Sequence, residues 1–217
     1  SAHQVQGVWY WGAGRIGDAV RSLDQAIDLL DGVPPPEDTF GAEKYLVTFT
    51  FWLYNHLLHG SISLEDAVRG YRELHDGAPD PVGRASVCGF AMTTFAPLLE
   101  WDHVEHFERL ALEADPRSQF GFWGGQLLMH RGLLAAWKGR IDDALELFAE
   151  GRSQYRGVGG CSGMHAFEAS FSLLLAEHGH QDEARNAAQR SRGLIEAKNE
   201  RWGETVTLLA EAEVAAG

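Results

Sequence analysis

The amino-acid sequence predicts an all-α protein. We expect antiparallel helix pairs to stack as a right-handed superhelical α-solenoid of about five repeats and a partial sixth. Three observations support this prediction: a short turn motif recurs along the chain, an apolar stripe of helical period follows its copies, and Gly and Pro residues close successive units.

The turn motif is clearest at 14–19 (Gly-Arg-Ile-Gly-Asp-Ala), 139–144 (Gly-Arg-Ile-Asp-Asp-Ala) and 179–184 (Gly-His-Gln-Asp-Glu-Ala). Looser copies occur at 60–67 and 101–104. Intervals of 37 to 48 residues separate the last small residue of each copy from the next, as is typical of helical repeat arrays. These landmark residues are Ala19, Ala67, Val104, Ala144 and Ala184.

Each part of the motif has a physical role. We expect the glycine to end one helix, because glycine adopts the left-handed conformation at little cost. The acidic residues then lie in the first turn of the next helix, where they complement its positive dipole end. The alanine lets the paired helix approach closely. Apolar residues follow at helical spacing, as in the series Ile16, Ala19, Val20, Leu23, Ala26, Ile27 and Leu30.

The elements follow in order as two helices per unit, with approximate units 1–36, 37–81, 82–117, 118–158 and 159–199, and a partial unit 200–217. Pro34 to Asp38 form an expected loop insertion between the first two units. Only 45–52 has a weak strand pattern, and its neighbours favour the first helix of unit two. Pro97 falls within the first helix of unit three, where we expect a kink or an early end. Because 201–216 resembles a first helix without its partner, we expect the chain to be a fragment of a longer protein whose uncapped end can pair with a second copy.

The composition restricts the function classes. The 18 Lys and Arg residues against 31 Asp and Glu give a net charge of −13, so direct nucleic-acid binding by this segment is not expected. The two cysteines predict buried free thiols in a reducing cytoplasm. We find no secretory signal, and the most apolar run, 46–58, is too short and too polar to span a membrane.

The small–small–aromatic spacing of Gly132, Ala144 and Phe148 resembles tetratricopeptide-type repeats, as does that of Gly7, Ala19 and Ala26. The periods near 40 residues and the missing Trp-Leu-Gly start depart from that family. The longer, degenerate form is similar to the helical-repeat regions of large bacterial ATP-binding LuxR-type transcriptional regulators. This resemblance implies a sensor or scaffold segment beside an ATPase and a DNA-binding domain.

Several short motifs have a structural interpretation that we favour over a catalytic one. Asp142, Asp143 and Glu146 match a magnesium-diphosphate pattern, but they also fit the acidic helix start of the repeat. The histidine pairs 56/59 and 103/106 lack the further ligands that zinc requires. The glycine-rich run 157–163 lacks the Lys-Ser/Thr of a phosphate loop. We therefore predict no catalytic residues, metal or cofactor.

The aromatic residues carry the functional prediction. They concentrate in or near the first helices, which line the concave face of such a solenoid, and they exceed what one core stripe requires. The repeat register predicts a ligand- or partner-binding groove formed by Phe90, Thr93, Gln126, Met129, His130, Leu133 and Trp137.

The leading hypothesis is a non-catalytic module that binds a protein or peptide partner, or a small effector, within a bacterial signalling or transcriptional regulator. A small-molecule receptor with a closed, aromatic-lined pocket is the second hypothesis. An α-helical enzyme, such as a cyclase or an α/α-barrel hydrolase, is the third, and it would need carboxylates that converge in one cavity.

Overall fold

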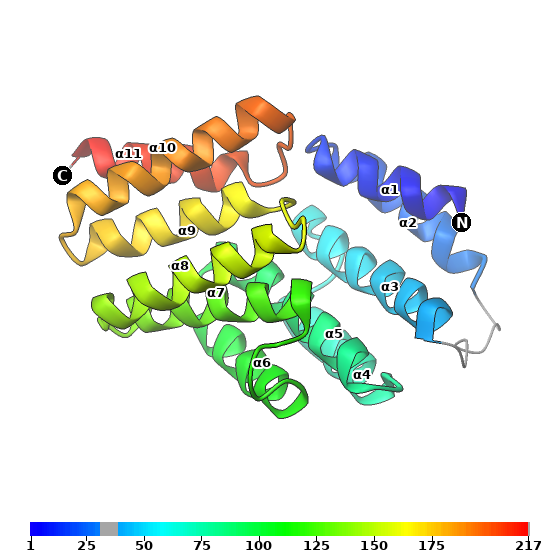
Figure 1. The fold of residues 1–217 in the computed structure, drawn as a ribbon. Helices are drawn as coiled ribbons and strands as arrows, with labels where there is room; N and C mark the ends of the chain where they lie inside the picture. Colours follow the sequence, from blue (N-terminus) through cyan, green and yellow to red (C-terminus); the bar gives the residue numbers. More distant parts are fainter. Residues whose placement is uncertain (31–38, 217) are drawn as a thin grey trace.

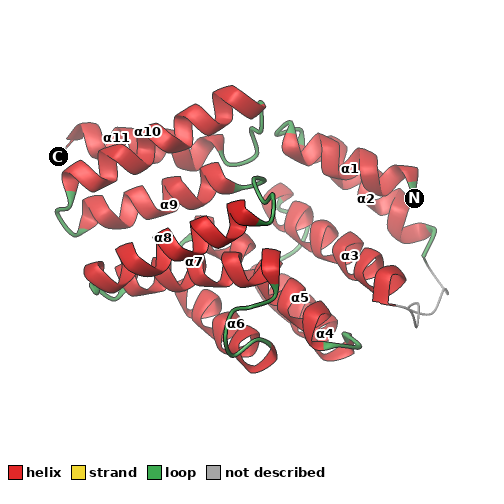
Figure 2. Ribbon diagram, in the orientation of Figure 1, coloured by secondary structure: helices red, strands yellow, loops and turns green. Residues whose placement is uncertain are grey.

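The computed structural model describes residues 1–30 and 39–216, and every regular element in these ranges is a helix (Figures 1 and 2). This confirms the all-α class. The segment 45–52, with its weak strand pattern, lies within a helix as expected. The predicted loop insertion at Pro34 to Asp38 lies outside the described residues. The same holds for two glycines at expected turns, Gly32 and Gly217.

The helices are α1 (Ala2–Gly12), α2 (Ile16–Asp28), α3 (Thr39–His59), α4 (Leu64–Gly77), α5 (Pro81–Phe95), η1 (Ala96–Leu98), α6 (Trp101–Ala114), α7 (Gly121–Trp137), α8 (Ile141–Gly157), α9 (Met164–Glu177), α10 (Gln181–Lys198) and α11 (Glu204–Ala216). Neighbours along the chain pack as pairs: α1 with α2, α3 with α4, α5 with α6, α7 with α8, and α9 with α10. Four of these pairs fall within one of the predicted unit ranges, and α5 begins at Pro81, one residue before the expected start of the third unit. The division of the chain into repeat units stays a prediction.

One residue in the left-handed conformation reverses the chain within each pair. A glycine with φ between 74° and 80° fills this position in four of the five turns, namely Gly14, Gly60, Gly139 and Gly179. The N–H of the next residue donates to a carbonyl five residues earlier, as Arg140 does to Ala135 (2.9 Å). This is the Schellman arrangement, which satisfies carbonyls that the helix end leaves free. The turn between α5 and α6 has the same bonds but uses Leu99, at φ 61°.

Small residues let the two helices of a pair approach to backbone contact. A Cβ added to Gly132 of α7 would lie 3.0 Å from Phe148 and 3.1 Å from the carbonyl oxygen of Ala144, both in α8. One added to Gly151 would lie 2.6 Å from the backbone nitrogen of Met129 and 2.7 Å from the oxygen of Gly125. All five landmark residues of the turn motif are fully buried, which confirms the packing role expected of them.

The first helices of successive pairs also contact one another, from α3 to α5, α5 to α7, α7 to α9 and α9 to α11. Figure 1 shows this succession passing round the molecule, so that the segment before α11 lies beside the end of α1. The backbone N–H of Arg201 donates to the carbonyl of Gly12 (2.7 Å). The end of α1 and the segment before α11 are therefore joined directly, whereas the two termini lie on opposite sides of the molecule (Figure 1).

Buried hydroxyl groups connect helices of neighbouring pairs. Tyr71 of α4 donates to the carbonyl of Thr50 in α3 (3.2 Å) and lies 2.7 Å from the hydroxyl of Thr94 in α5. Ser191 of α10 likewise bonds the carbonyl of His165 in α9 and the hydroxyl of Thr207 in α11, each at 2.7 Å. Because a buried polar group without a partner is costly, these bonds fix the relative positions of the helices.

Two further expectations from the sequence meet different outcomes. Helix α5 ends at Phe95 and passes into the short 3-10 helix η1, so the early end expected before Pro97 is confirmed. The burial expected for both cysteines holds only for Cys88, whereas Cys161 is exposed. Cys161 lies in the loop between α8 and α9, where no helix covers it.

Replacing Leu99 by glycine should stabilise the protein. The left-handed conformation costs a side-chain-bearing residue about 1–2 kcal/mol, and glycine loses part of this advantage through the greater freedom of the unfolded chain. Leu99 is 57% exposed, so little packing is lost. We expect the free energy of unfolding to rise by about 0.5–1 kcal/mol in urea denaturation. Gly139→Ala, the converse change, should destabilise, and a lower stability of Leu99→Gly would contradict this explanation of the turn.

Two glycine-to-alanine substitutions should have opposite signs. Gly151→Ala forces a methyl group against the backbone of α7 and should destabilise by about 1–3 kcal/mol, as overpacking does. Gly193 of α10 faces open space, so Gly193→Ala should stabilise by roughly 0.5–1 kcal/mol through helix propensity alone. Thermal unfolding followed by circular dichroism measures both, and equal shifts would show that helix contact at Gly151 is not tight.

Candidate functional site

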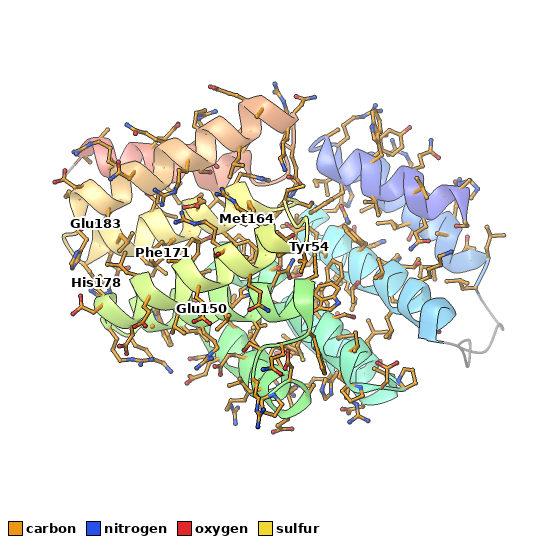
Figure 3. All side chains as sticks on the ribbon, in the orientation of Figure 1. Tyr54, Glu150, Met164, Phe171, His178 and Glu183 are labelled. Carbon is orange, nitrogen blue, oxygen red and sulfur yellow. The ribbon has the colours of Figure 1, made fainter. Side chains whose placement is uncertain are left out.

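A cavity of about 380 Å³ lies where the first helices of the pairs meet the segment before α11. Its walls come from α1, α3, α5, α7, α8 and α9, with the loop after α8 and the segment before α11. Tyr54, one of its lining residues, lies toward the centre of the view in Figure 3. The lining residues are Trp11, Val47, Phe51, Tyr54, Phe90, Thr93, Phe122, Trp123, Gln126, Tyr155, Ser162, Gly163, Phe167 and Trp202.

Aromatic contacts join the end of α1 to the segment before α11 at one wall of the cavity. Trp11 stacks on Trp202, with ring centroids 4.8 Å apart and planes inclined by 23°. Tyr54 packs edge-on against both indoles, at 6.0 and 5.8 Å. Residues from the first pair, from α3 and from the segment before α11 thus form one cluster. Such aromatic pairs contribute energy beyond the area they bury.

The aromatic contacts continue around the cavity. Phe51 packs on Trp11 (5.0 Å) and on Phe90 (5.1 Å), and Phe90 packs on Trp123 (5.3 Å). Phe122 then connects Trp123 to Tyr155, at 4.8 and 4.6 Å. The first four helix pairs therefore contribute to one unbroken series of rings.

Few polar groups of the described residues face this aromatic wall, and one of them has an atom without a hydrogen-bond partner. Gln126 is 8% exposed, and its Oε1 is buried without a partner. The indole N–H of Trp11 is buried beside the side chain of Tyr54, with which it interacts. Other polar groups are satisfied within the protein: Thr93 donates to the carbonyl of Gly89 (2.8 Å) and Tyr155 to that of Ser162 (2.9 Å).

Among the residues that the structure describes, no charged side chain lines the cavity, and the tyrosines that line it are neutral. Burial raises the pKa of Tyr54 and that of Tyr155 far above their ordinary value. None of the lining residues is Asp, Glu, Lys, Arg or His. The cavity therefore offers aromatic surface and a few neutral hydrogen-bonding groups.

A partly buried carboxylate positions the two loops at the cavity edge. Glu200 accepts from the hydroxyl of Ser162 (2.6 Å), the backbone N–H of Gly163 (3.2 Å) and the indole of Trp202 (3.3 Å). Its Oε2 lies 3.6 Å from Nδ1 of His165. Burial alone would raise the pKa of Glu200, but these donors outweigh burial and lower the pKa to about 2.

Three of the seven residues that the repeat register predicts for the groove line the cavity: Phe90, Thr93 and Gln126. His130 and Leu133 line a much smaller cavity of about 10 Å³, which shares Thr93 and Phe167 with the main one. Burial lowers the pKa of His130 to about 3, so this histidine is neutral and donates to the carbonyl of Gln126 (2.9 Å).

The remaining two predicted groove residues lie elsewhere. Met129 is fully buried in the helical core and lines neither cavity. Trp137, at the end of α7, stacks on Trp101 at 6.1 Å. Of the five predicted groove residues in α7, Gln126 lines the main cavity, and the assignment of these residues to a binding groove stays a prediction.

The lining residues outside the predicted set are mostly aromatic. Phe51, Tyr54, Phe122 and Trp123 belong to runs that the sequence shows as an excess of aromatics over the core stripe. That excess was the available signal for them. Trp11 and Trp202 lie near opposite ends of the sequence, and no local pattern indicates that they stack.

The motifs with alternative catalytic interpretations occupy structural positions. Asp142 and Asp143 lie in the first turn of α8. His56 lies 2.9 Å from the carboxylate of Asp24, and the Nε of Arg72 donates to His106 (3.2 Å). Within 1–30 and 39–216, no group of three or more His, Cys, Asp or Glu side chains has a geometry suited to a metal ion.

Comparisons with known proteins found no matching family model, no similar curated protein and no similar solved structure. Among the described helices, none has the length and apolar character needed to cross a membrane.

Glu200→Gln should destabilise the protein in a pH-dependent way. The pKa of Glu200 is lower in the folded chain than in the unfolded one, so its stabilisation is present above pH 4.5 and is lost as the pH falls toward 2. We expect the free energy of unfolding of the variant to be about 2 kcal/mol lower than that of the unsubstituted protein at pH 7. This difference should shrink below pH 4.5. The matched control is Glu150→Gln on the exposed face of α8, whose free energy of unfolding should equal that of the unsubstituted protein. A difference that is constant from pH 7 to pH 3 would contradict the role assigned to the Glu200 charge.

Proposed function

We propose that this chain is a receptor module. It is an α-solenoid of tetratricopeptide-like helix pairs that curves until its first and last units meet around a small effector. The observation that carries the proposal is the discrete aromatic cavity of about 380 Å³, a volume within the range of small-molecule sites. Convergent aromatic walls with a small number of polar groups are typical of such sites.

A small molecule fits this cavity better than a peptide or protein partner does. Solenoids that bind peptides use an extended concave surface. Here the stack of Trp11 on Trp202 and the bond from Arg201 to Gly12 join the first and last units, which would interrupt such a surface. Binding is also favoured over catalysis, because a cyclase or an α/α-barrel hydrolase requires convergent carboxylates and none of the described residues that line the cavity supplies one.

The position of the cavity suggests how occupancy is transmitted. An effector there would contact helices of all five pairs together with the segment before α11. It would stabilise the arrangement in which the ends are joined, provided that it binds this arrangement more tightly than an opened one. Within a LuxR-type regulator, this change in curvature would reach the neighbouring domains. Pairing of two copies through α11, which exposes Leu208 and Leu209, stays a prediction.

The test is a titration with N-phenyl-1-naphthylamine, an uncharged fluorophore whose emission rises in apolar sites. We expect saturable binding to the unsubstituted protein and a loss of affinity of roughly tenfold or more in Phe90→Ala, which removes a ring from the middle of the wall. The control is Trp137→Ala, an aromatic truncation away from the cavity, which should leave the affinity within about twofold.

Circular dichroism must first show that both variants keep their helical content. Absence of saturable binding, or equal losses in the two variants, would overturn the assignment of the cavity as the binding site.

A further inference from the structure

We propose that the effector is an uncharged, planar aromatic molecule that donates a hydrogen bond from a ring N–H or O–H to Oε1 of Gln126. The proposal rests on the receptor function above and specifies the chemistry of the ligand. Three properties of the cavity support it: the aromatic walls, the absence of charge and the unpartnered amide.

The walls favour a flat aromatic ligand. Rings from four helix pairs border the cavity in series, from Trp11 through Phe51 and Phe90 to Trp123. Planar rings pack against such walls in stacked and edge-on arrangements that contribute about 0.5–1.5 kcal/mol per pair beyond the buried area. A flexible aliphatic ligand lacks this contribution and loses more conformational freedom on binding.

Electrostatics favours a neutral ligand. A charged group brought into the cavity would lose its hydration, and none of the described side chains that line the walls carries an opposite charge to compensate. The nearest carboxylate described above, Glu200, already accepts bonds from Ser162, Gly163 and Trp202. Attraction of a cation to the ring faces is the one competing interaction, and a cationic probe tests it directly.

The amide of Gln126 specifies a hydrogen-bond donor. A buried acceptor without a partner costs about 1–3 kcal/mol, so the free protein retains a cost that a ligand donor would remove. The orientation of the amide follows from its neighbour Tyr155. The Tyr155 hydroxyl donates to the carbonyl of Ser162 and also hydrogen-bonds the side chain of Gln126, so it accepts from the amide nitrogen and leaves the oxygen without a partner.

The experiment compares two tricyclic probes of nearly equal shape. Carbazole has a ring N–H where fluorene has a methylene group, so their affinity ratio isolates the donor. We expect carbazole to bind the unsubstituted protein about tenfold more tightly than fluorene, as one hydrogen bond to a buried acceptor predicts. The permanent cation 10-methylacridinium should bind more weakly than either.

Two substitutions in the cavity assign the preference to one atom. Gln126→Met keeps the side-chain length but removes the acceptor, so the two probes should bind it within about twofold of each other. The matched control is Thr93→Val. The Thr93 hydroxyl is already bonded to Gly89, so this variant should keep the carbazole preference even if it is somewhat less stable.

The outcomes separate this inference from the receptor function itself. Equal affinity for carbazole and fluorene, or persistence of the preference in Gln126→Met, overturns the donor requirement while binding of N-phenyl-1-naphthylamine sustains the receptor function. Tightest binding of 10-methylacridinium overturns the requirement for a neutral ligand. Failure of all four probes to bind overturns both proposals.

Discussion

Within each helix pair the chain reverses direction at a residue in the left-handed conformation, and the geometry of that turn fixes where the next pair begins. The turn satisfies the last carbonyls of one helix and aligns the next helix for contact along its small residues. Since the same turn recurs five times, its geometry is applied repeatedly along the chain. The one position that lacks glycine, Leu99, adopts the same conformation, which shows that the fold dictates the turn even against local preference.

The repeated turns bring together residues that are distant in the sequence. Trp11 and Trp202 meet because the helix pairs pass round the molecule, and the bond from Arg201 to Gly12 joins the backbones at the same place. Glu200 accepts hydrogen bonds from the neighbouring loop and from the Trp202 indole, and these bonds stabilise the cavity wall. The cavity is thus a consequence of how the whole chain is arranged. Its ligand-facing groups, in contrast, depend on single residues such as Gln126.

Much of the fold could be predicted from the sequence because its determinants are local. Gly139, Asp143 and Ala144 indicate a turn, a helix start and a close contact within a few residues, and the structure confirms all three roles. The cavity was predictable only in part. Gln126, near the start of α7, lines the cavity, whereas Trp137, at the other end of the same helix, packs on Trp101 and does not line it. Closure by Trp11 and Trp202 was not predictable, since it depends on the sum of several inter-helix angles that no single motif specifies.

Hydrogen exchange of the Arg201 backbone amide, followed by NMR, tests most directly whether the segment before α11 is joined to the end of α1 at the cavity. If they are, this amide exchanges slowly although it lies in a loop, with protection comparable to that of neighbouring helix amides. Its protection should fall in Trp202→Ala while the amide of Gly139, in a turn away from the closure, keeps its own rate. Exchange of Arg201 at the rate of an unstructured amide in the unsubstituted protein, with the helices still protected, would show that the segment before α11 does not meet α1 and that the cavity lacks this wall.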